Sequence, residues 1–143
     1  MGKAFTLVEI LLVLGITTIL VSVILTMGID FYNTRQLDIH ARGIVQSLRK
    51  AQSKAAASEN DSNFGVFLTN DNYILFKGDS YALRDSQYDE IFDLPQVLTV
   101  GGIQEIVFSK SEGLPSVSGN IVLSNDTDGR TININPIGRI NLE

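Results

Sequence analysis

A chain of 143 residues is long enough for one domain with a sizeable core and too short for two ordinary domains. Its formal net charge of −5 disfavours general attraction to nucleic acid or to anionic membrane surfaces, which a basic face would supply. Because the chain contains no cysteine, neither a disulfide framework nor a thiolate metal site can form.

The first predicted element is an apolar run from Phe5 to Met27, in which Glu9 is the one ionisable residue. As a helix it would rise about 34 Å, enough to cross a hydrocarbon core of about 30 Å. A cleavable secretory signal is the alternative, but its apolar region usually covers only about 7–15 residues. Lys3 precedes the run and Asp30 follows it, so the positive-inside bias places the N-terminus in the cytoplasm. The run therefore predicts a single-pass membrane protein whose larger part lies outside the cytoplasm.

Glu9 is the residue on which the functional interpretation depends. A carboxylate inside a membrane span costs about 2.5–3.5 kcal/mol on the insertion scale, so it normally marks a partner or a function. The alternative is that Glu9 lies close enough to the helix start to reach the interface and has no further role. The two interpretations differ in whether its charge can be removed without loss of function.

A family resemblance rests on the start of the chain, which reads Lys3-Ala4-Phe5-Thr6-Leu7-Val8-Glu9. It resembles the processing site of type IV pilins and type II secretion pseudopilins: a short basic leader, a small residue, then Phe-Thr-Leu-Val-Glu. The resemblance implies that a prepilin peptidase removes the leader, residues 1–4, by cutting between Ala4 and Phe5, and that the new Phe5 amine is methylated. The family usually has glycine where this chain has Ala4, and four residues make a short leader.

The same resemblance implies a role for Glu9 in assembly. In the family this carboxylate neutralises the N-terminal amine of a neighbouring subunit. The amine of Phe5 and the carboxylate of Glu9 are each costly alone in an apolar environment, and pairing between chains offsets part of each cost. The implied partners are other pilin or pseudopilin subunits, the prepilin peptidase, an inner-membrane assembly platform and the bacterial inner membrane itself.

The next predicted element is the amphipathic half of the same helix, over residues 28–60. Apolar residues recur there at spacings of three or four, as in a helix that packs on one side. This stripe comprises Leu37, Ala41, Ile44, Val45, Leu48 and Ala55, with Gln52 interrupting it. Asn60-Asp61-Ser62-Asn63 is a stop signal, so one helix is expected from about Phe5 to about Glu59. Gly15, Gly28 and Gly43 are its expected weak points, at about 1 kcal/mol each relative to alanine.

Residues 61–143 predict an antiparallel β domain, because short runs rich in β-branched and aromatic residues alternate with turn residues. The predicted strands are Phe64–Thr69, Tyr73–Lys77, Ile91–Leu94, Val97–Val100, Glu105–Ser109, Asn120–Ser124, Arg130–Asn135 and Ile137–Leu142. The polar stretch Gly78–Asp89 predicts an exposed loop. The expected fold is therefore α+β and pilin-like: a long N-terminal helix with a membrane-spanning first half, packed on one antiparallel sheet.

The closing motifs Gly119-Asn120-Ile121-Val122-Leu123 and Ile137-Gly138-Arg139-Ile140 make the chain similar to the GspH/FimT type of minor subunit. This resemblance implies a minor pilin or pseudopilin, a structural subunit of a type IV pilus or type II secretion filament that assists filament initiation or tip assembly. A major pilin, a DNA-uptake minor pilin and an unrelated single-span membrane protein are the alternatives.

Other candidate sites have simpler explanations. Asp126-Thr127-Asp128-Gly129 resembles the start of a calcium loop but lacks the later ligands, and a hairpin turn explains it. With His40 as the sole histidine and no cysteine, no catalytic triad or histidine-rich metal site can be assembled, so neither an enzyme nor a cofactor is expected. Nucleic acid binding is not favoured either, because Arg130 and Arg139 form a thin basic footprint.

Overall fold

The computed structural model describes residues 5–143, apart from the side chains of residues 24–31 and 33. The predicted leader, residues 1–4, and with it Ala4 of the predicted cleavage site, lies outside the described residues. The predicted weak point at Gly28 falls among the residues whose side chains are not described. The chain divides into two compact units, Met1–Arg35 and Gln36–Glu143.

Among residues 5–143, the helical elements are one long helix and three short 3-10 helices. They are α1 Leu7–Ala56, η1 Glu59–Asp61, η2 Tyr81–Leu83 and η3 Ser86–Tyr88. Thr6 caps the start of α1, where its carbonyl and its hydroxyl both accept from the backbone N–H of Glu9, at 3.1 and 3.3 Å. The helix ends at Ala56 because Ser58 adopts a left-handed conformation, with a φ of 53°, and Asn60 and Asp61 do the same. The predicted helix, from about Phe5 to about Glu59, is thus two or three residues too long at each end.

In the first unit, every described side chain from Phe5 to Val23 is exposed. No helical segment among the residues with described side chains is both long and apolar enough to cross a membrane. This finding contradicts the predicted membrane-spanning half over residues 5–27 and the single-pass inner-membrane location that was derived from it.

The second unit contains two antiparallel sheets of four strands each, where a single sheet was expected. The first has the order β3-β2-β1-β5 and the second the order β4-β6-β7-β8. The strands are β1 Phe64–Leu68, β2 Asn72–Lys77, β3 Glu90–Asp93, β4 Thr99–Gly102, β5 Glu105–Phe108, β6 Gly119–Ser124, β7 Gly129–Ile134 and β8 Ile140–Leu142. Each predicted strand is confirmed with ends that differ by at most three residues.

The division into two sheets follows from two long-range strand pairings. After β3 the chain turns at Pro95, whose carbonyl accepts from the N–H of Leu98 at 2.9 Å, and β4 then pairs with β6 instead of extending the first sheet. β5 returns to the first sheet and pairs with β1. The α+β class therefore stands, whereas the predicted pilin-like arrangement, a membrane-spanning helix on one sheet, is contradicted.

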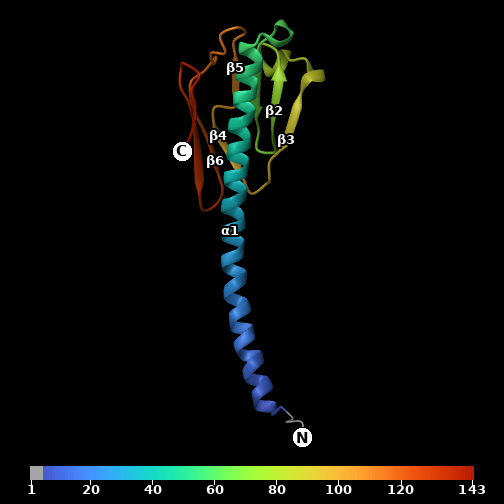
Figure 1. Ribbon diagram of the computed structural model, residues 1–143, viewed down its shortest axis with the longest axis vertical. Helices are drawn as coiled ribbons and strands as arrows, with labels where there is room; N and C mark the ends of the chain where they lie inside the picture. The colour runs from blue at the N-terminus through green and yellow to red at the C-terminus, as the bar shows by residue number, and fades with distance from the viewer. Residues whose placement is uncertain (1–4) are drawn as a thin grey trace. The chain divides into compact units, whose positions relative to one another are not determined.

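In the second unit, buried side chains from α1 and from both sheets form one hydrophobic cluster. This core lies between the helix and the sheets (Figure 1). The predicted helical stripe supplies the helix side: Leu37, Ala41, Ile44, Val45, Leu48 and Ala55 are buried, together with Ala51. Phe64 and Phe108 from the first sheet and Ile121 and Ile132 from the second are each at most 1 % exposed. The stripe is therefore confirmed as a packing surface of the domain.

Polar contacts fasten the loops and strands of this unit to the helix. The side-chain amide of Gln52 donates to the carbonyls of Gly113 and Gly138, at 3.0 and 2.9 Å. Gly138 has a φ of 81°, and a Cβ there would collide with the Gln52 amide. On the opposite flank, Lys50 pairs with Glu90 of β3 at 2.6 Å. Gln52, the polar residue that interrupts the stripe, therefore links α1 to two loops through hydrogen bonds.

Candidate functional site

The candidate functional site is the described apolar surface of α1 in the first unit. Thirteen large apolar side chains are exposed there, from 51 % for Ile10 and Ile16 to 76 % for Phe5. They are Phe5, Leu7, Val8, Ile10, Leu11, Leu12, Val13, Leu14, Ile16, Ile19, Leu20, Val21 and Val23. A helix that is apolar on all sides is normally buried, and a contiguous exposed apolar surface of this kind marks an interaction site.

The hydroxyl groups within this surface are satisfied by the helix itself. Thr17 donates to the carbonyls of Val13 and Leu14, at 2.8 and 3.0 Å, and Thr18 donates to the Leu14 carbonyl at 2.7 Å. Ser22 donates to the Ile19 carbonyl at 2.7 Å. A hydroxyl that bonds to its own helix can be removed from water at low cost, since its donor remains paired. The surface can therefore be covered by apolar groups over these positions as well.

Phe5 and Glu9, the predicted processing and assembly residues that the structure describes, lie together at the start of this surface. With Ile10, Val13 and Leu14 they line a hollow of about 300 Å³. The carboxylate of Glu9 is thus an ionisable group within an otherwise apolar depression. A cation seated there would meet one carboxylate and four apolar side chains.

Glu9 also has a local structural role that the sequence interpretation missed. Thr6 is the N-cap of α1 and Glu9 is the third helical residue, whose backbone N–H bonds to the Thr6 hydroxyl. Thr6-x-x-Glu9 is the capping-box pattern, which would have been visible in the sequence. A carboxylate in the first turn is also favoured by the helix dipole. Any assembly role for Glu9 must therefore be separated from its contribution to the helix start.

The weak metal candidates Asp126 and Asp128 lie in the loop between β6 and β7, where Asn125 organises the turn. Its side-chain oxygen accepts from the N–H of Thr127 at 3.0 Å and from the N–H of Asp128 at 2.6 Å. This is an Asx turn, which explains the loop without a cation. Among the residues that the structure describes, no group of three or more acidic or histidine side chains is placed to hold a metal ion.

Arg130 and Arg139, the two candidate DNA-contacting residues, have different surroundings. Arg130 of β7 pairs with Asp38 of α1 at 2.7 Å, so it fastens the second sheet to the helix. Arg139 is exposed, in the loop before β8. One of the two cations is therefore neutralised within the domain, which weakens an already small basic footprint.

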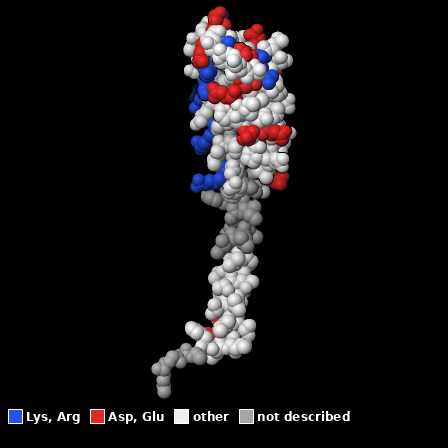
Figure 2. All heavy atoms as spheres, turned by 90° about the vertical axis from the view of Figure 1, so that its right-hand side faces the viewer, with Lys and Arg blue, Asp and Glu red and all other residues white. Residues whose placement is uncertain are grey.

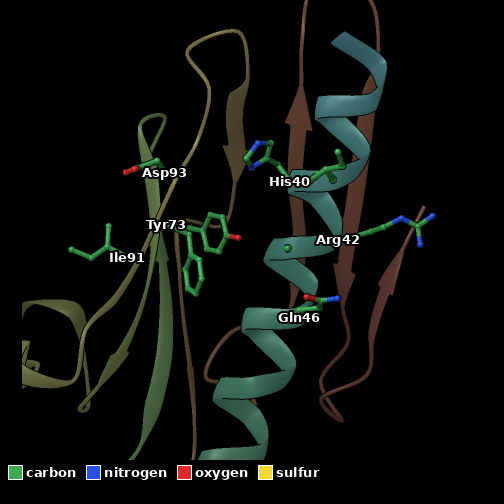
Figure 3. Close-up of a pocket in the computed structure, with 9 residues that line it drawn as sticks. His40, Arg42, Gln46, Tyr73, Ile91 and Asp93 are labelled. Carbon is green, nitrogen blue, oxygen red and sulfur yellow. The ribbon is translucent and has the colours of Figure 1, made fainter. Parts of the chain in front are cut away.

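His40 lies in a groove of about 660 Å³ between α1 and the β2–β3 side of the first sheet (Figure 3). Tyr73 and Phe92 stack with their ring centroids 4.9 Å apart and form part of its floor. Burial lowers the pKa of His40, because desolvation disfavours the imidazolium, and burial raises the pKa of Tyr73 despite its hydrogen bond with Ser47. Both side chains are therefore neutral at pH 7.

Comparison with known proteins identifies no relative, since no protein-family model, no curated protein and no solved structure matches the chain. What the chain does is therefore inferred from its own residues.

Proposed function

We propose that this chain is a structural subunit of a filament of the type IV pilin or type II secretion pseudopilin class, as a minor subunit that assists filament initiation or tip assembly. The proposal is carried by the exposed apolar surface of α1, which holds the carboxylate of Glu9 in its first turn. No catalytic step is assigned to the chain. Its partners in this proposal are other subunits of the same class and a prepilin peptidase.

Helix-to-helix contact is the simplest way to cover this surface. Fully burying one leucine or valine side chain contributes about 1.5–3 kcal/mol, so thirteen exposed apolar side chains strongly favour association. Equivalent helices of neighbouring subunits present the same kind of surface and can cover it from several sides. The internally bonded hydroxyls of Thr17, Thr18 and Ser22 are compatible with such contact.

Glu9 would act where two such helices meet. Cleavage before Phe5 creates a positive amine at the helix start, and Glu9 of a neighbour supplies the opposite charge. Leaving one member of a buried ion pair without its partner costs about 3–5 kcal/mol. The hollow lined by Phe5 and Glu9 is the place where a neighbour's amine would be received.

Two substitutions separate this role from helix capping. Glu9→Gln keeps a residue that completes the capping box but removes the charge. Thr6→Ala removes the cap but keeps the charge. The full chain would be co-expressed with a prepilin peptidase in a host that assembles filaments of this class, with cleavage followed by intact mass and assembly by filament yield.

We expect Glu9→Gln to be cleaved normally and to lose assembly, whereas Thr6→Ala should assemble. Cleavage should shorten both chains by the four residues before Phe5. Normal assembly of Glu9→Gln would remove the ion pair from the proposed mechanism. An uncut wild-type chain, in a host that processes a control pilin, would count against membership of the class.

A further inference from the structure

In the globular unit, Gln36–Glu143, one side of α1 carries exposed arginine side chains. Arg42, Gln46 and Arg49 follow one another at helical spacing on α1, are all exposed, and are called the α1 edge here. Figure 2 shows several Lys and Arg side chains along one flank of this unit, and further ones among Asp and Glu side chains near its top. The α1 edge thus carries two exposed positive charges, Arg42 and Arg49.

The first sheet of this unit has an open edge. β3 is the outer strand of the first sheet, and it pairs with β2 alone. The N–H of Leu94 bonds to the carbonyl of Asp71 at 2.8 Å, so the alternating pattern of an antiparallel pair turns the backbone groups of Ile91 and Asp93 toward the open side. Ile91 is 60 % exposed, and Asp93 is exposed beside it. Ile91 and Asp93 are called the β3 edge.

Of the charged residues on the two edges, Arg49 donates to the Ile140 carbonyl at 3.1 Å, whereas Arg42 and Asp93 form no ion pair within the domain. Arg42 and Asp93 stand on either side of the groove in Figure 3 and extend away from each other. None of the ion pairs found between described residues involves Arg42 or Asp93. In contrast, the neighbouring residues Lys50 and Glu90 form an ion pair, with 2.6 Å between Nζ and Oε2. Arg42 and Asp93 are therefore available to a second molecule.

We propose that the α1 edge of one copy of this chain docks on the β3 edge of the next, with Arg42 opposite Asp93. The two groups point in opposite directions, so one copy can receive a neighbour on each side. Such a heterologous contact repeats without closing a two-fold dimer, and repeated contacts of this kind build filaments. The proposal rests on the proposed filament function and assigns the surfaces by which its globular domains meet.

The absence of cysteine from the chain makes a direct cross-linking test possible. Gln46→Cys places a thiol one turn from Arg42, and Ile91→Cys places one two residues from Asp93, so the charged residues stay intact. Purified full-length chains carrying the two substitutions separately would be mixed and oxidised. We expect a disulfide-linked dimer from the mixture and little from either variant alone. A chain carrying both substitutions should give a ladder of longer products.

Charge reversal then tests the pairing itself. Arg42→Glu in the Gln46→Cys chain should lower the cross-linked yield about tenfold, the change produced by a loss of about 1.4 kcal/mol. Asp93→Arg in the Ile91→Cys chain should restore most of that yield by re-pairing the charges. Glu112→Lys is the matched control, because Glu112 is exposed near the η1 end of the domain and its reversal should leave the yield unchanged.

Equal cross-linking by the mixture and by the single variants would overturn the proposal, as would a charge-reversed pair that shows no recovery. If no cross-link forms and Arg42→Glu instead abolishes salt-sensitive retention on duplex DNA, the α1 edge belongs to a nucleic acid site and the proposal falls. The outcome is separable from that of the proposed function, because the cross-link should persist in the Glu9→Gln chain. Loss of the cross-link with normal filament assembly would reject the domain contact alone.

Discussion

A side chain at position 43 of α1, now Gly43, is expected to lower the stability of the domain for a steric reason that is separate from helix propensity. A Cβ at this position would lie 2.7 Å from the hydroxyl oxygen of Tyr73 and 3.7 Å from its Cζ. Tyr73 is 5 % exposed and stacks on Phe92, so its ring has little room to retreat. Gly43 was interpreted from the sequence as a weak point of the helix, whereas the structure indicates that the glycine makes room for a tyrosine.

The magnitude follows from two opposing effects. Alanine is better than glycine in a helix by about 1 kcal/mol. Forcing an additional methyl group into a packed core costs about 1–3 kcal/mol. We therefore expect Gly43→Ala to lower the free energy of unfolding by up to about 2 kcal/mol, the difference between these two values.

The same substitution should change sign when the tyrosine hydroxyl is absent. In a Tyr73→Phe chain the nearest ring carbon remains at 3.7 Å, an ordinary van der Waals contact, so only the helix preference is left. Gly43→Ala should then raise the free energy of unfolding by about 1 kcal/mol. Tyr73→Phe alone should cost about 1 kcal/mol, because it removes the hydrogen bond with Ser47.

Urea unfolding of the four chains in this cycle, followed by circular dichroism, measures the coupling between the two sites. Ser53→Ala, at an exposed position of the same helix, is the matched control and should be slightly stabilising in both backgrounds. If Gly43→Ala has the same sign with and without the Tyr73 hydroxyl, the steric explanation is refuted.

Three further predictions concern the same domain. Gln52→Leu should lower the free energy of unfolding by about 1–3 kcal/mol, because it removes the donor to the Gly113 and Gly138 carbonyls; Gln52→Glu, which also lacks that donor, should not rescue it in urea unfolding. The free energy of unfolding should fall as pH rises above about 10, because burial raises the pKa of Tyr73 in the folded state and the unfolded state loses the proton first. The dependence of the free energy of unfolding on pH should be weaker in Tyr73→Phe. Asn125→Ala should cost about 1 kcal/mol by removing the Asx turn, and added Ca²⁺ should not shift the wild-type urea midpoint; a shift that Asp126→Asn abolished would instead establish a cation site.

The positions of the strands could be predicted, because each is a local pattern of β-branched and aromatic residues bounded by turn residues. Their division into two sheets could not. It depends on β4 pairing with β6 and on β5 pairing with β1, choices made between segments far apart in the chain. The chain reverses at Pro95, and a reversal alone does not determine which strand comes next in the sheet.

The stretch Gly78–Asp89 illustrates a second limit. Its composition indicated an exposed loop, but η2 and η3 lie within it and Arg84 organises it. The guanidinium of Arg84 lies over the Tyr81 ring at 3.8 Å and its Nε donates to Asp89 at 2.8 Å. Tyr81 in turn stacks on Phe67 of β1, with centroids 4.0 Å apart. Order of this kind arises from side-chain contacts with a strand, which local composition does not encode.

At the candidate site, the apolar run and Glu9 were visible in the sequence, but the run was interpreted through its length alone. In the structure, the large apolar side chains from Phe5 to Val23 are exposed, so a second apolar surface is needed to remove them from water. Thr6 is part of the processing motif, and its spacing to Glu9 also predicts a capping box. A residue inside a recognised motif can thus have a second, local reason to be there.

In the proposed assembly, the apolar surface of α1 and the charged edges of the domain would have different roles. Apolar burial is strong but non-directional, and a helix that is apolar on all sides gives a neighbour no preferred rotation about its axis. Charges at fixed positions add little net affinity but fix register, because a mismatched like-charge contact is costly. Glu9 can set the register along the helix, and Arg42 with Asp93 can set the rotation of the domain. Substitution at Glu9 should therefore reduce how much assembles, whereas Arg42→Glu should disturb how regularly the copies are arranged.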